Sequence, residues 1–581
     1  MSNDIAKELQ ELKDKNEAPD WMSVEGFTTL KGGYLLENET PKGMYRRVAR
    51  SAAKSGNFSD DDKDDFFDII YSGYLGPASP ILMNLGTDRG LPISCFGLDL
   101  EDQMEDIMGR GLGELSMMSK NSGGVGVGFD NLRPAGSLIK GGKNGTSDGI
   151  IPFLKTYDSA TMASKQGRVR RGNTSANVNI EHKDWFDFVK MRRPEGDVNR
   201  QILNIHHCTM INDEFMHKVK NGDYEARLRW AELLKTRLET GEPYIMFNDT
   251  VNRANPEAYK NNGLTVNMTN ICSEITLFAD ALHSFICCLS SLNLANYDLI
   301  RAYKSPRTGR SVPAISVRFL NGVLDEFITK ASSVPYLEKT VASAEKGRAI
   351  GLGAMGWHTL LKENMIPFGS FRAMQLNNEV FKWIDEESRE ESKNMASEKG
   401  EPEWCKDTGM YNSHLSALAP TRSNSNICGK HGQSISASIE PDVSNAFNEI
   451  TAKGTFQKRD VHLKRLLAEK GQDTDEVWKS VIKNSGSVQH LSFLSEEEKN
   501  VFKTAYEIDQ NVIVQQAAQR QKYICQSQSL NVFFPFDVDP VYFNNVHINA
   551  WQLGVKTLYY CRSTSGLKDI KQDDGCVSCE G

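Results

Sequence analysis

The hydrophobic positions of the chain follow two different spacings, one after the other. Over residues 1–75, apolar side chains recur at helical spacing, as in Ile5–Leu12, and a second helical stretch over Pro41–Ser55 has proline in its first turn. From Gly76 onward, short apolar runs are separated by glycines, as in Gly123–Phe129, which is typical of strands joined by tight turns. The pattern predicts a helical N-terminal region over 1–75 and a strand-containing region after it.

Strand-like runs then alternate with amphipathic helices. Trp230–Leu238 has helical spacing and is followed by the apolar run Tyr244–Phe247. Such alternation favours an α/β architecture of parallel strands with helical crossovers. A charged stretch predicts a small helical insertion at about 450–505. The apolar run Ser529–Phe534 again predicts a strand, and residues 562–581 form a polar tail.

Composition excludes several classes of protein. The 581 residues include 39% hydrophobic and 25% charged side chains, as in globular proteins in water. With 68 basic and 76 acidic residues the net charge is −8, so we expect no general attraction to nucleic acid or to an anionic membrane. Met1–Asn16 contains no apolar signal region, and no apolar run approaches the length of about 18 residues that a membrane span needs. We therefore expect a cytoplasmic protein.

Eleven cysteines stand out in such a chain. In the cytoplasm thiols stay reduced, so a cysteine pair that matters there is catalytic, redox-sensing or metal-binding more often than structural. Cys576 and Cys579 form a Cys-x-x-Cys on the tail, which we expect to be flexible, and this indicates a redox shuttle. Half of a zinc site is the alternative, but no second Cys/His pair with ligand spacing is evident.

Asn270, Cys272 and Glu274 place an amide, a thiol and a carboxylate at alternate positions. On an extended backbone alternate side chains share a face, so the three groups can converge on one small ligand. A neighbouring carboxylate disfavours the thiolate, so the pairing fits hydrogen-atom chemistry by a neutral thiol better than nucleophilic attack. Other cysteines follow at Cys287 and Cys288.

Several such segments together resemble the large, catalytic subunit of class I ribonucleotide reductase, over nearly the whole chain. The segments that carry the resemblance are Ser94-Cys95, Asn270-x-Cys272-x-Glu274, Cys287-x-Leu289-Ser290-x-x-Asn293-Leu294, Ala419-Pro420-Thr421-Arg422-Ser423-Asn424-Ser425, Thr557-Leu558-Tyr559-Tyr560 and the cysteine-bearing tail. Each match is modest alone, and their number and order make the identification specific.

The resemblance implies a role for each residue of the predicted catalytic set. Cys272 would form the thiyl radical that removes hydrogen from C3′ of a ribonucleotide, Glu274 would accept the 3′-hydroxyl proton, and Asn270 would hold the sugar hydroxyls. Cys95 and Cys287 would supply two electrons and become a disulfide as the 2′-hydroxyl leaves as water. By sequence alone Cys288 is equally placed to pair with Cys95, whereas the family pattern favours Cys287.

The resemblance also implies where the radical and the reducing equivalents come from. Tyr560 and then Tyr559 would relay the radical from a small partner subunit, which would carry the metal-radical cofactor, with none bound covalently on this chain. The Cys576 and Cys579 thiols would reduce the disulfide and be reduced in turn by thioredoxin or glutaredoxin. The adjacent tyrosines disfavour a cobalamin-dependent reductase, which is the runner-up.

The family pattern further implies two sets of ligand-binding residues. The substrate set offers hydroxyls, amides and backbone N–H groups to phosphate: Ser79, Ser94, Thr421, Arg422, Ser423, Asn424 and Ser425. The effector set would bind a nucleoside triphosphate, ATP or a dNTP. It consists of Asp102, seven residues after Cys95, and of Arg133, Arg168 and Arg170 in the glycine-rich basic segments 133–142 and 166–173.

The implied enzyme is a homodimer that reduces ribonucleoside diphosphates to deoxyribonucleoside diphosphates for DNA synthesis. Its implied fold is a ten-stranded α/β barrel over 76–561, built from two five-stranded parallel halves packed antiparallel, with Cys272 on a central loop. Lys31–Leu36 resembles the start of the family's helical region, so we expect the N-terminal ATP-cone to be absent. A nucleotide-binding regulator that lost the reaction is the alternative from another class, and the intact set around Cys272 weighs against it.

Overall fold

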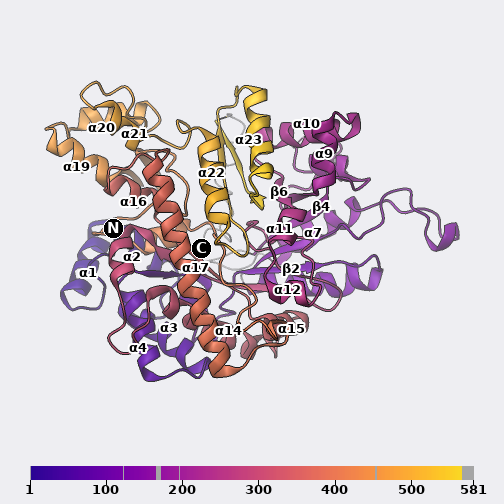
Figure 1. The fold of residues 1–581 in the computed structure, drawn as a ribbon, viewed down its shortest axis with the longest axis horizontal. Helices are drawn as coiled ribbons and strands as arrows, with labels where there is room; N and C mark the ends of the chain where they lie inside the picture. Colours follow the sequence, from indigo (N-terminus) through magenta and orange to yellow (C-terminus); the bar gives the residue numbers. More distant parts are fainter. Residues whose placement is uncertain (1, 122, 165–171, 195, 452–453, 565–581) are drawn as a thin grey trace.

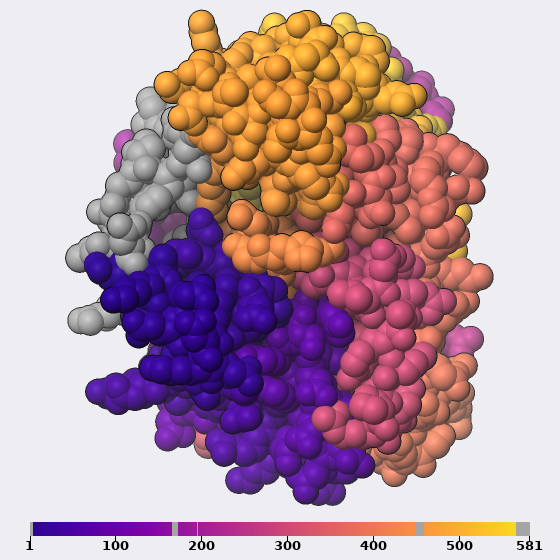
Figure 2. All heavy atoms as spheres, turned by 90° about the vertical axis from the view of Figure 1, so that its left-hand side faces the viewer, coloured from indigo at the N-terminus to yellow at the C-terminus, as the bar shows by residue number. Residues whose placement is uncertain are grey.

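The computed structural model describes residues 2–121, 123–164, 172–194, 196–451 and 454–564. Its N-terminal region is helical, as predicted, and lies on one side of the molecule (Figures 1 and 2). The helices there are α1 (Ser2–Asp14), α2 (Val24–Lys31), α3 (Pro41–Ser55) and α4 (Asp60–Tyr71). Helix α3 begins at the predicted proline, and the Thr40 hydroxyl caps it by accepting a hydrogen bond from the Gly43 N–H at 3.1 Å.

Five parallel strands form the first half of a larger sheet. They are β2 (Cys95–Asp99), β3 (Gly124–Gly128), β4 (Asn173–Asn179), β5 (His206–Ile211) and β6 (Tyr244–Phe247), paired in that order. The helical segments after them are the π-helix η1 (Glu105–Gly111), α6 (Leu112–Lys120), α7 (Ile151–Ser164), α8 (Trp185–Lys190), α9 (Asp213–Asn221), α10 (Tyr224–Thr240), α11 (Asn248–Arg253) and α12 (Glu257–Asn261). The strands are buried along nearly their whole length, as expected for a parallel sheet covered by helices.

The second half joins the first through an antiparallel pairing of β2 with β7. Strand β7 (Phe285–Asn293) also pairs with β1 (Leu75–Pro77) and β8 (Ile350–Met355). Strand β12 (Thr557–Leu558) pairs with β6 at the far edge of the first half, and β11 (Val532–Phe534) forms a separate parallel pair with β13 (Cys561–Ser563). The helices of this half are α5 (Ser79–Asn84), α13 (Tyr297–Ala302), α14 (Val312–Ala331), α15 (Glu338–Gly347), α16 (Trp357–Glu363), α17 (Phe371–Lys399), α18 (Arg422–Ile427), α22 (Gln510–Gln521) and α23 (Pro540–Gln552). Beyond β8, single bridges join Leu352 to Ser416 and Leu418 to Gln528 in parallel.

The α/β prediction is confirmed, whereas the count of ten strands is not. Within the described ranges one sheet contains nine strands, including the antiparallel edges β1 and β12. The first half has the expected five parallel strands. In the second half, the segments around Ser416 and Gln528 pair too briefly to form continuous strands.

The predicted insertion has its own small core. It comprises a hairpin of β9 (Ala446–Thr451) and β10 (Gly454–Arg459), which the sequence did not indicate, and three helices, α19 (Val461–Glu469), α20 (Asp475–Lys483) and α21 (Glu496–Val501). Leu463, Leu467 and Trp478 pack together there, apart from the main core. Figure 1 shows the three helices at the periphery, above the N-terminal helices, so the insertion leaves the sheet undisturbed.

A buried loop that contains Thr269, Asn270, Cys272 and Glu274 crosses the face of the parallel half of the sheet. Glycine in β3 lets the backbone of this loop approach the sheet closely. A Cβ atom on Gly126 of β3 would lie 2.1 Å from the Thr269 carbonyl oxygen and 3.0 Å from the Asn270 Cα. The Asn177 side chain holds the same loop, because its Nδ2 donates to the Thr269 oxygen at 3.1 Å and its Oδ1 accepts from the Thr269 N–H at 3.3 Å. The loop therefore packs backbone against backbone on the sheet.

Among the described residues, no helix is long and apolar enough to cross a membrane. Helices α3 and α4 pack on α14, and α14 packs on α17. The long helices thus join the N-terminal region to the second half of the sheet (Figure 1).

We predict that Gly126→Ala destabilises the fold, because the added methyl group must displace the Thr269 carbonyl. Overpacking of this kind costs about 1–3 kcal/mol of unfolding free energy. Urea denaturation followed by circular dichroism measures the change. Gly109→Ala is the matched control, since nothing lies within 4 Å of its Cβ position. Equal stability of the two variants would contradict the close packing of loop and sheet.

Candidate active site

The buried loop presents Asn270, Cys272 and Glu274 at the centre of the sheet. The turn is held from within, because Asn270 Oδ1 accepts the Ile275 N–H at 3.0 Å and Ser273 adopts a positive φ of 66°. All three predicted side chains are at most 1% exposed. Asn270 Nδ2 has no hydrogen-bond partner in the described part of the chain, so a buried donor remains for a ligand.

Cys95 and Cys287 lie directly opposite each other on β2 and β7. Directly opposed residues of an antiparallel pair point to the same face, so both thiols face the loop side of the sheet, and Cys288 points to the other face. The register therefore favours Cys287 as the neighbour of Cys95, a choice that the sequence left open.

Glu274 connects the loop to these thiols. The Cys95 thiol donates to Glu274 Oε1 at 3.8 Å, and the Ser529 hydroxyl donates to Oε2 at 3.1 Å. Burial raises the pKa of Glu274 to about 7, against hydrogen bonds that lower it. A carboxyl with this pKa exchanges protons near neutral pH, as a general base must.

The Cys287 thiol is kept neutral by its surroundings. Burial raises the pKa of Cys287 well above the usual range, although Gln526 Nε2 donates to the sulfur at 3.4 Å. The same side chain donates to the Ile350 carbonyl at 3.0 Å, which fixes it across β8. A neutral buried thiol is suited to giving up hydrogen and electrons and poorly suited to nucleophilic attack.

Tyr559 and Tyr560 form a close aromatic pair behind the loop. Their ring centroids are 4.4 Å apart, and the Tyr244 ring lies 4.5 Å from that of Tyr559. The segment Ser529–Leu530 ties this pair to the loop, because the Ser529 hydroxyl donates to the Cys272 carbonyl at 2.6 Å and the Leu530 carbonyl accepts the Tyr559 N–H at 2.8 Å. Tyr559 is buried and Tyr560 is half-buried, so the pair leads from the interior towards the surface.

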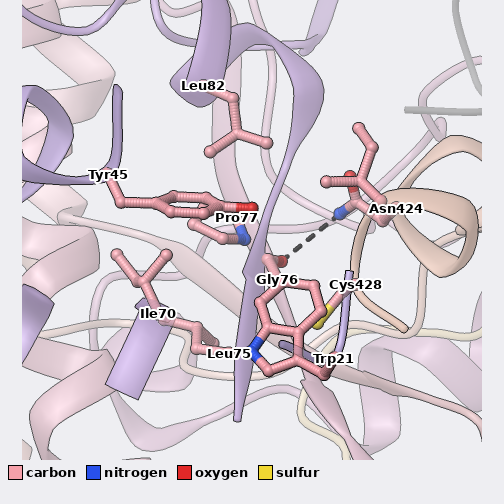
Figure 3. Close-up of a pocket in the computed structure, with 10 residues that line it drawn as sticks. Trp21, Tyr45, Ile70, Leu75, Gly76, Pro77, Leu82, Asn424 and Cys428 are labelled. Carbon is pink, nitrogen blue, oxygen red and sulfur yellow. Dashed lines mark hydrogen bonds between the residues drawn. The ribbon is translucent and has the colours of Figure 1, made fainter. Parts of the chain in front are cut away.

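The predicted phosphate-binding residues lie at the start of α5, just before β2 and in and before α18. Asn424 of α18 donates to the Gly76 carbonyl at 3.3 Å, beside a small cavity lined by Tyr45 and Cys428 (Figure 3). The Asn424 Oδ1 atom is buried and has no partner among the described residues. The positions of the remaining members are as follows: Ser79 at the start of α5, Ser94 before β2, Thr421 before α18, and Arg422, Ser423 and Ser425 within it.

Two of the four predicted effector residues lie together at the surface. The Arg133 guanidinium donates to Asp102 at 2.6 Å, and both side chains are about one third exposed (38% and 32%). Arg168 and Arg170 lie outside the described residues, as do Cys576 and Cys579 of the tail. The described ranges contain no cluster of three or more His, Cys, Asp or Glu side chains that fits a metal ion.

The sequence did not identify several residues that shape the site. Gln526 and Ser529 hold the Cys287 thiol and the Glu274 carboxylate, and Asn177 holds the loop. The polar run Gln526-Ser527-Gln528-Ser529 ahead of an apolar stretch was a usable signal, because polar side chains at buried positions need specific partners.

Comparison with known proteins identifies the family to which the chain belongs. The family described as ribonucleotide reductase, barrel domain, matches residues 93–228, 223–406 and 403–561, and the ribonucleotide reductase all-alpha domain matches residues 21–90. A ribonucleoside-diphosphate reductase large subunit of Invertebrate iridescent virus 3 is 33% identical, over 96% of this chain and 98% of its own. That of Vaccinia virus (strain Copenhagen) is 29% identical, over 96% of this chain and 81% of its own.

A solved structure is similar over nearly the same length. The Actinobacillus ureae class Id ribonucleotide reductase alpha subunit superposes with a TM-score of 0.85 and 38% sequence identity, covering 94% of this chain and 98% of that chain. The barrel prediction is thereby confirmed. The site geometry, the two matching domain families and these relatives agree, and the chain belongs to the ribonucleotide reductase large-subunit family.

Proposed function

We propose that this chain reduces ribonucleoside diphosphates to 2′-deoxyribonucleoside diphosphates by thiyl-radical chemistry. One observation carries the proposal: the Cys95 thiol, opposite Cys287, donates to the carboxylate of Glu274 on the loop that bears Cys272. A dithiol, a base and a third thiol thus meet in one buried site. The names of the relatives support the diphosphate level of the substrate.

The reaction begins with hydrogen abstraction at the loop. The Cys272 thiyl radical takes hydrogen from C3′, which is feasible because the S–H and C–H bonds are of similar strength. Glu274, with a pKa of about 7, accepts the 3′-hydroxyl proton, and the spare Asn270 N–H group orients the sugar. Loss of that proton eases departure of the neighbouring 2′-hydroxyl.

The dithiol then completes the reduction. Cys95 and Cys287 supply two electrons and two protons, the 2′-hydroxyl leaves as water, and the two sulfurs join in a disulfide. Cys272 returns its hydrogen to C3′ and becomes a thiyl radical again. The tail thiols Cys576 and Cys579 reduce the disulfide by exchange, and thioredoxin or glutaredoxin reduces the tail.

Radical initiation belongs to a partner. The close contact of the Tyr559 and Tyr560 rings favours a small subunit that carries the metal-radical cofactor, and the similarity to a class Id alpha subunit supports this reading. The Asp102–Arg133 ion pair supports an effector nucleotide site at the surface, of the kind that works across a homodimer. Arg168 and Arg170 would complete that site.

Reconstituted turnover tests the proposed function. The chain, a small subunit from the same source, four ribonucleoside diphosphates and dithiothreitol should yield deoxyribonucleoside diphosphates, measured by chromatography. Cys272→Ser should abolish the product, because an alcohol does not form the needed radical. Turnover with adenosylcobalamin and no small subunit would establish the runner-up. Unchanged turnover of Cys272→Ser would refute the catalytic role of Cys272, and absence of product from every combination would leave only nucleotide binding.

We expect replacement of Cys287 and replacement of Cys288 to affect product formation very differently, although the two residues are neighbours in the sequence. Cys287→Ser should stop product formation, because no disulfide can form with Cys95. Cys288→Ser, pointing to the other face of β7, should keep turnover within a few-fold of the native rate. Quantifying product per chain for both variants checks the pairing. A reversed result would assign the dithiol to Cys288.

Activity should fall as the pH drops below about 7, because protonated Glu274 no longer accepts the 3′-hydroxyl proton.

The contribution of Glu274 to the free energy of unfolding should change with pH in the opposite direction to the activity. Since the pKa rises from 4.5 in the unfolded chain to about 7 on folding, the contribution of Glu274 to folding is full below pH 4.5 and is lost as the pH rises through 7. Profiles of kcat/KM and of urea midpoints against pH separate the two. Glu274→Gln should lower kcat by about 10²-fold or more and remove the acid limb; an unchanged profile would exclude Glu274 as the base.

A further inference from the structure

Gln526 contacts the Cys287 sulfur, and the chemistry described above gives this contact no role. The side chain is fully buried, and its Nε2 atom donates to Cys287 Sγ at 3.4 Å and to the Ile350 carbonyl at 3.0 Å. A carbonyl oxygen can only accept a hydrogen bond, so an amide turned the other way would place two oxygens together. Ile350 therefore keeps the N–H end of the amide at the thiol.

The chain around Gln526 holds this amide in place. The Lys556 ammonium, only 1% exposed, donates to the carbonyls of Cys525 and Gln526 at 2.5 and 2.8 Å. The Gln521 amide donates to the same Gln526 carbonyl at 3.0 Å, and the Gln526 N–H group donates to the Ser416 carbonyl at 3.1 Å. A donor that is fixed in advance needs no reorganisation when charge develops at the sulfur.

The hydrogen bond from Gln526 is strongest when the Cys287 sulfur is negative. A neutral thiol is a weak acceptor, whereas hydrogen bonds to an ionised acceptor are roughly twice as strong as neutral ones. Burial raises the pKa of Cys287 well above the usual range, so the resting thiol is neutral. The same burial makes a thiolate costly whenever one forms there, and an N–H donor at the sulfur lowers that cost.

Reduction of a disulfide forms such a thiolate. The incoming thiolate bonds to one sulfur of the disulfide, and the other sulfur leaves with the electron pair of the S–S bond. The sulfur whose thiolate is better stabilised leaves faster. The surroundings of the two sulfurs therefore decide which one the incoming thiol attacks.

Cys95 and Cys287 have different surroundings in this respect. Cys95 Sγ lies 3.8 Å from a carboxylate oxygen of Glu274, which opposes negative charge on that sulfur once Glu274 is ionised. The Ser94 hydroxyl, 3.5 Å from Cys95 Sγ, is uncharged and offsets a full negative charge only in part. Cys95 is also the more accessible residue, at 4% exposed against 0% for Cys287.

We propose that Cys287 leaves as a thiolate stabilised by Gln526 when the Cys95–Cys287 disulfide is reduced, so that the incoming thiol bonds to Cys95. The inference deepens the proposed function and rests on its disulfide. The incoming thiol gives up its proton, its sulfur bonds to Cys95, and the S–S bond breaks. The electron pair stays on Cys287, which then takes up a proton. The second thiol of the reductant bonds to the first, and Cys95 leaves and is protonated in turn. The reductant dithiol is thereby oxidised to a disulfide, and Cys95 and Cys287 are again thiols.

Trapping with a small monothiol locates the attacked sulfur. The chain alone, with Cys576→Ser and Cys579→Ser to exclude the tail, is oxidised with diamide and treated briefly with 2-mercaptoethanol at pH 8, where Glu274 is ionised. After an acid quench and alkylation of the new thiols, mass spectrometry of the peptides measures the adduct at each cysteine. We expect about tenfold more adduct on Cys95 than on Cys287. Equal amounts, or more on Cys287, would overturn the proposal.

Gln526→Met tests the hydrogen bond, because methionine has a similar length and no N–H donor. Loss of one hydrogen bond to a charged group should slow cleavage of the disulfide by 2-mercaptoethanol about tenfold or more. The equilibrium with a dithiothreitol redox buffer should stay within a few-fold of native, since the Cys287 sulfur is uncharged in both the disulfide and the dithiol. An unchanged rate would overturn the proposal. An equilibrium that shifts as much as the rate would assign Gln526 a structural role and overturn it too.

Gln528 provides a matched control in the same segment. It is fully buried, but its Nε2 donates to the Ala517 carbonyl and to Gln521 Oε1, both at 2.9 Å, and not to a thiol. Gln528→Met should therefore keep the native rate of cleavage. Equal slowing of the Gln526 and Gln528 variants would overturn the proposal.

The trapping experiment also separates this inference from the proposed function. It needs neither the small subunit nor a nucleotide, so a complex without turnover would refute the function and leave the adduct ratio as predicted. An adduct mainly on Cys287 in a chain that turns over would refute the inference alone. Failure of diamide to join Cys95 to Cys287 would remove the disulfide on which both depend.

Discussion

The structure depends on burying an irregular loop against a parallel sheet. A buried loop must satisfy its backbone polar groups without the regular partners of a helix or strand. Here Asn177 pairs with both polar backbone atoms of Thr269, and Asn270 closes the turn on Ile275. Gly126 leaves the space that the approach requires. These contacts hold the backbone on both sides of Cys272, the proposed catalytic thiol, so the position of this thiol does not depend on side-chain packing alone.

The same burial determines the protonation states in the site. Removal from water keeps the Cys287 thiol neutral and raises the pKa of the Glu274 carboxyl to about 7. Beside Tyr560 the outcome is the opposite, because there Arg192 and His206 outweigh burial and keep the carboxylate of Glu242 ionised. The neutral groups around Cys287 and the ionised groups around Glu242 thus lie in neighbouring parts of the protein, with Tyr559 and Tyr560 between them.

Much of the fold follows from local pattern, and the site follows only in part. The proline at the start of α3 and the alternation around β6 predict elements that the structure contains. The pairing of Cys95 with Cys287 depends on a register between distant strands, which no local pattern specifies. The segment around Gln526 was not predicted as part of the site, because its geometry is irregular and its partners are far away in sequence.

The position of the two thiols has a mechanical consequence. Cys95 and Cys287 face each other across the antiparallel pairing that joins the two halves of the sheet. Under the proposed chemistry, each reduction closes a covalent ring around the entire parallel half, which restricts the unfolded chain. The spent enzyme would then be harder to unfold than the enzyme ready for reaction. Resistance to unfolding would therefore report the fraction of chains in a sample that carry the Cys95–Cys287 disulfide and have not yet been reduced.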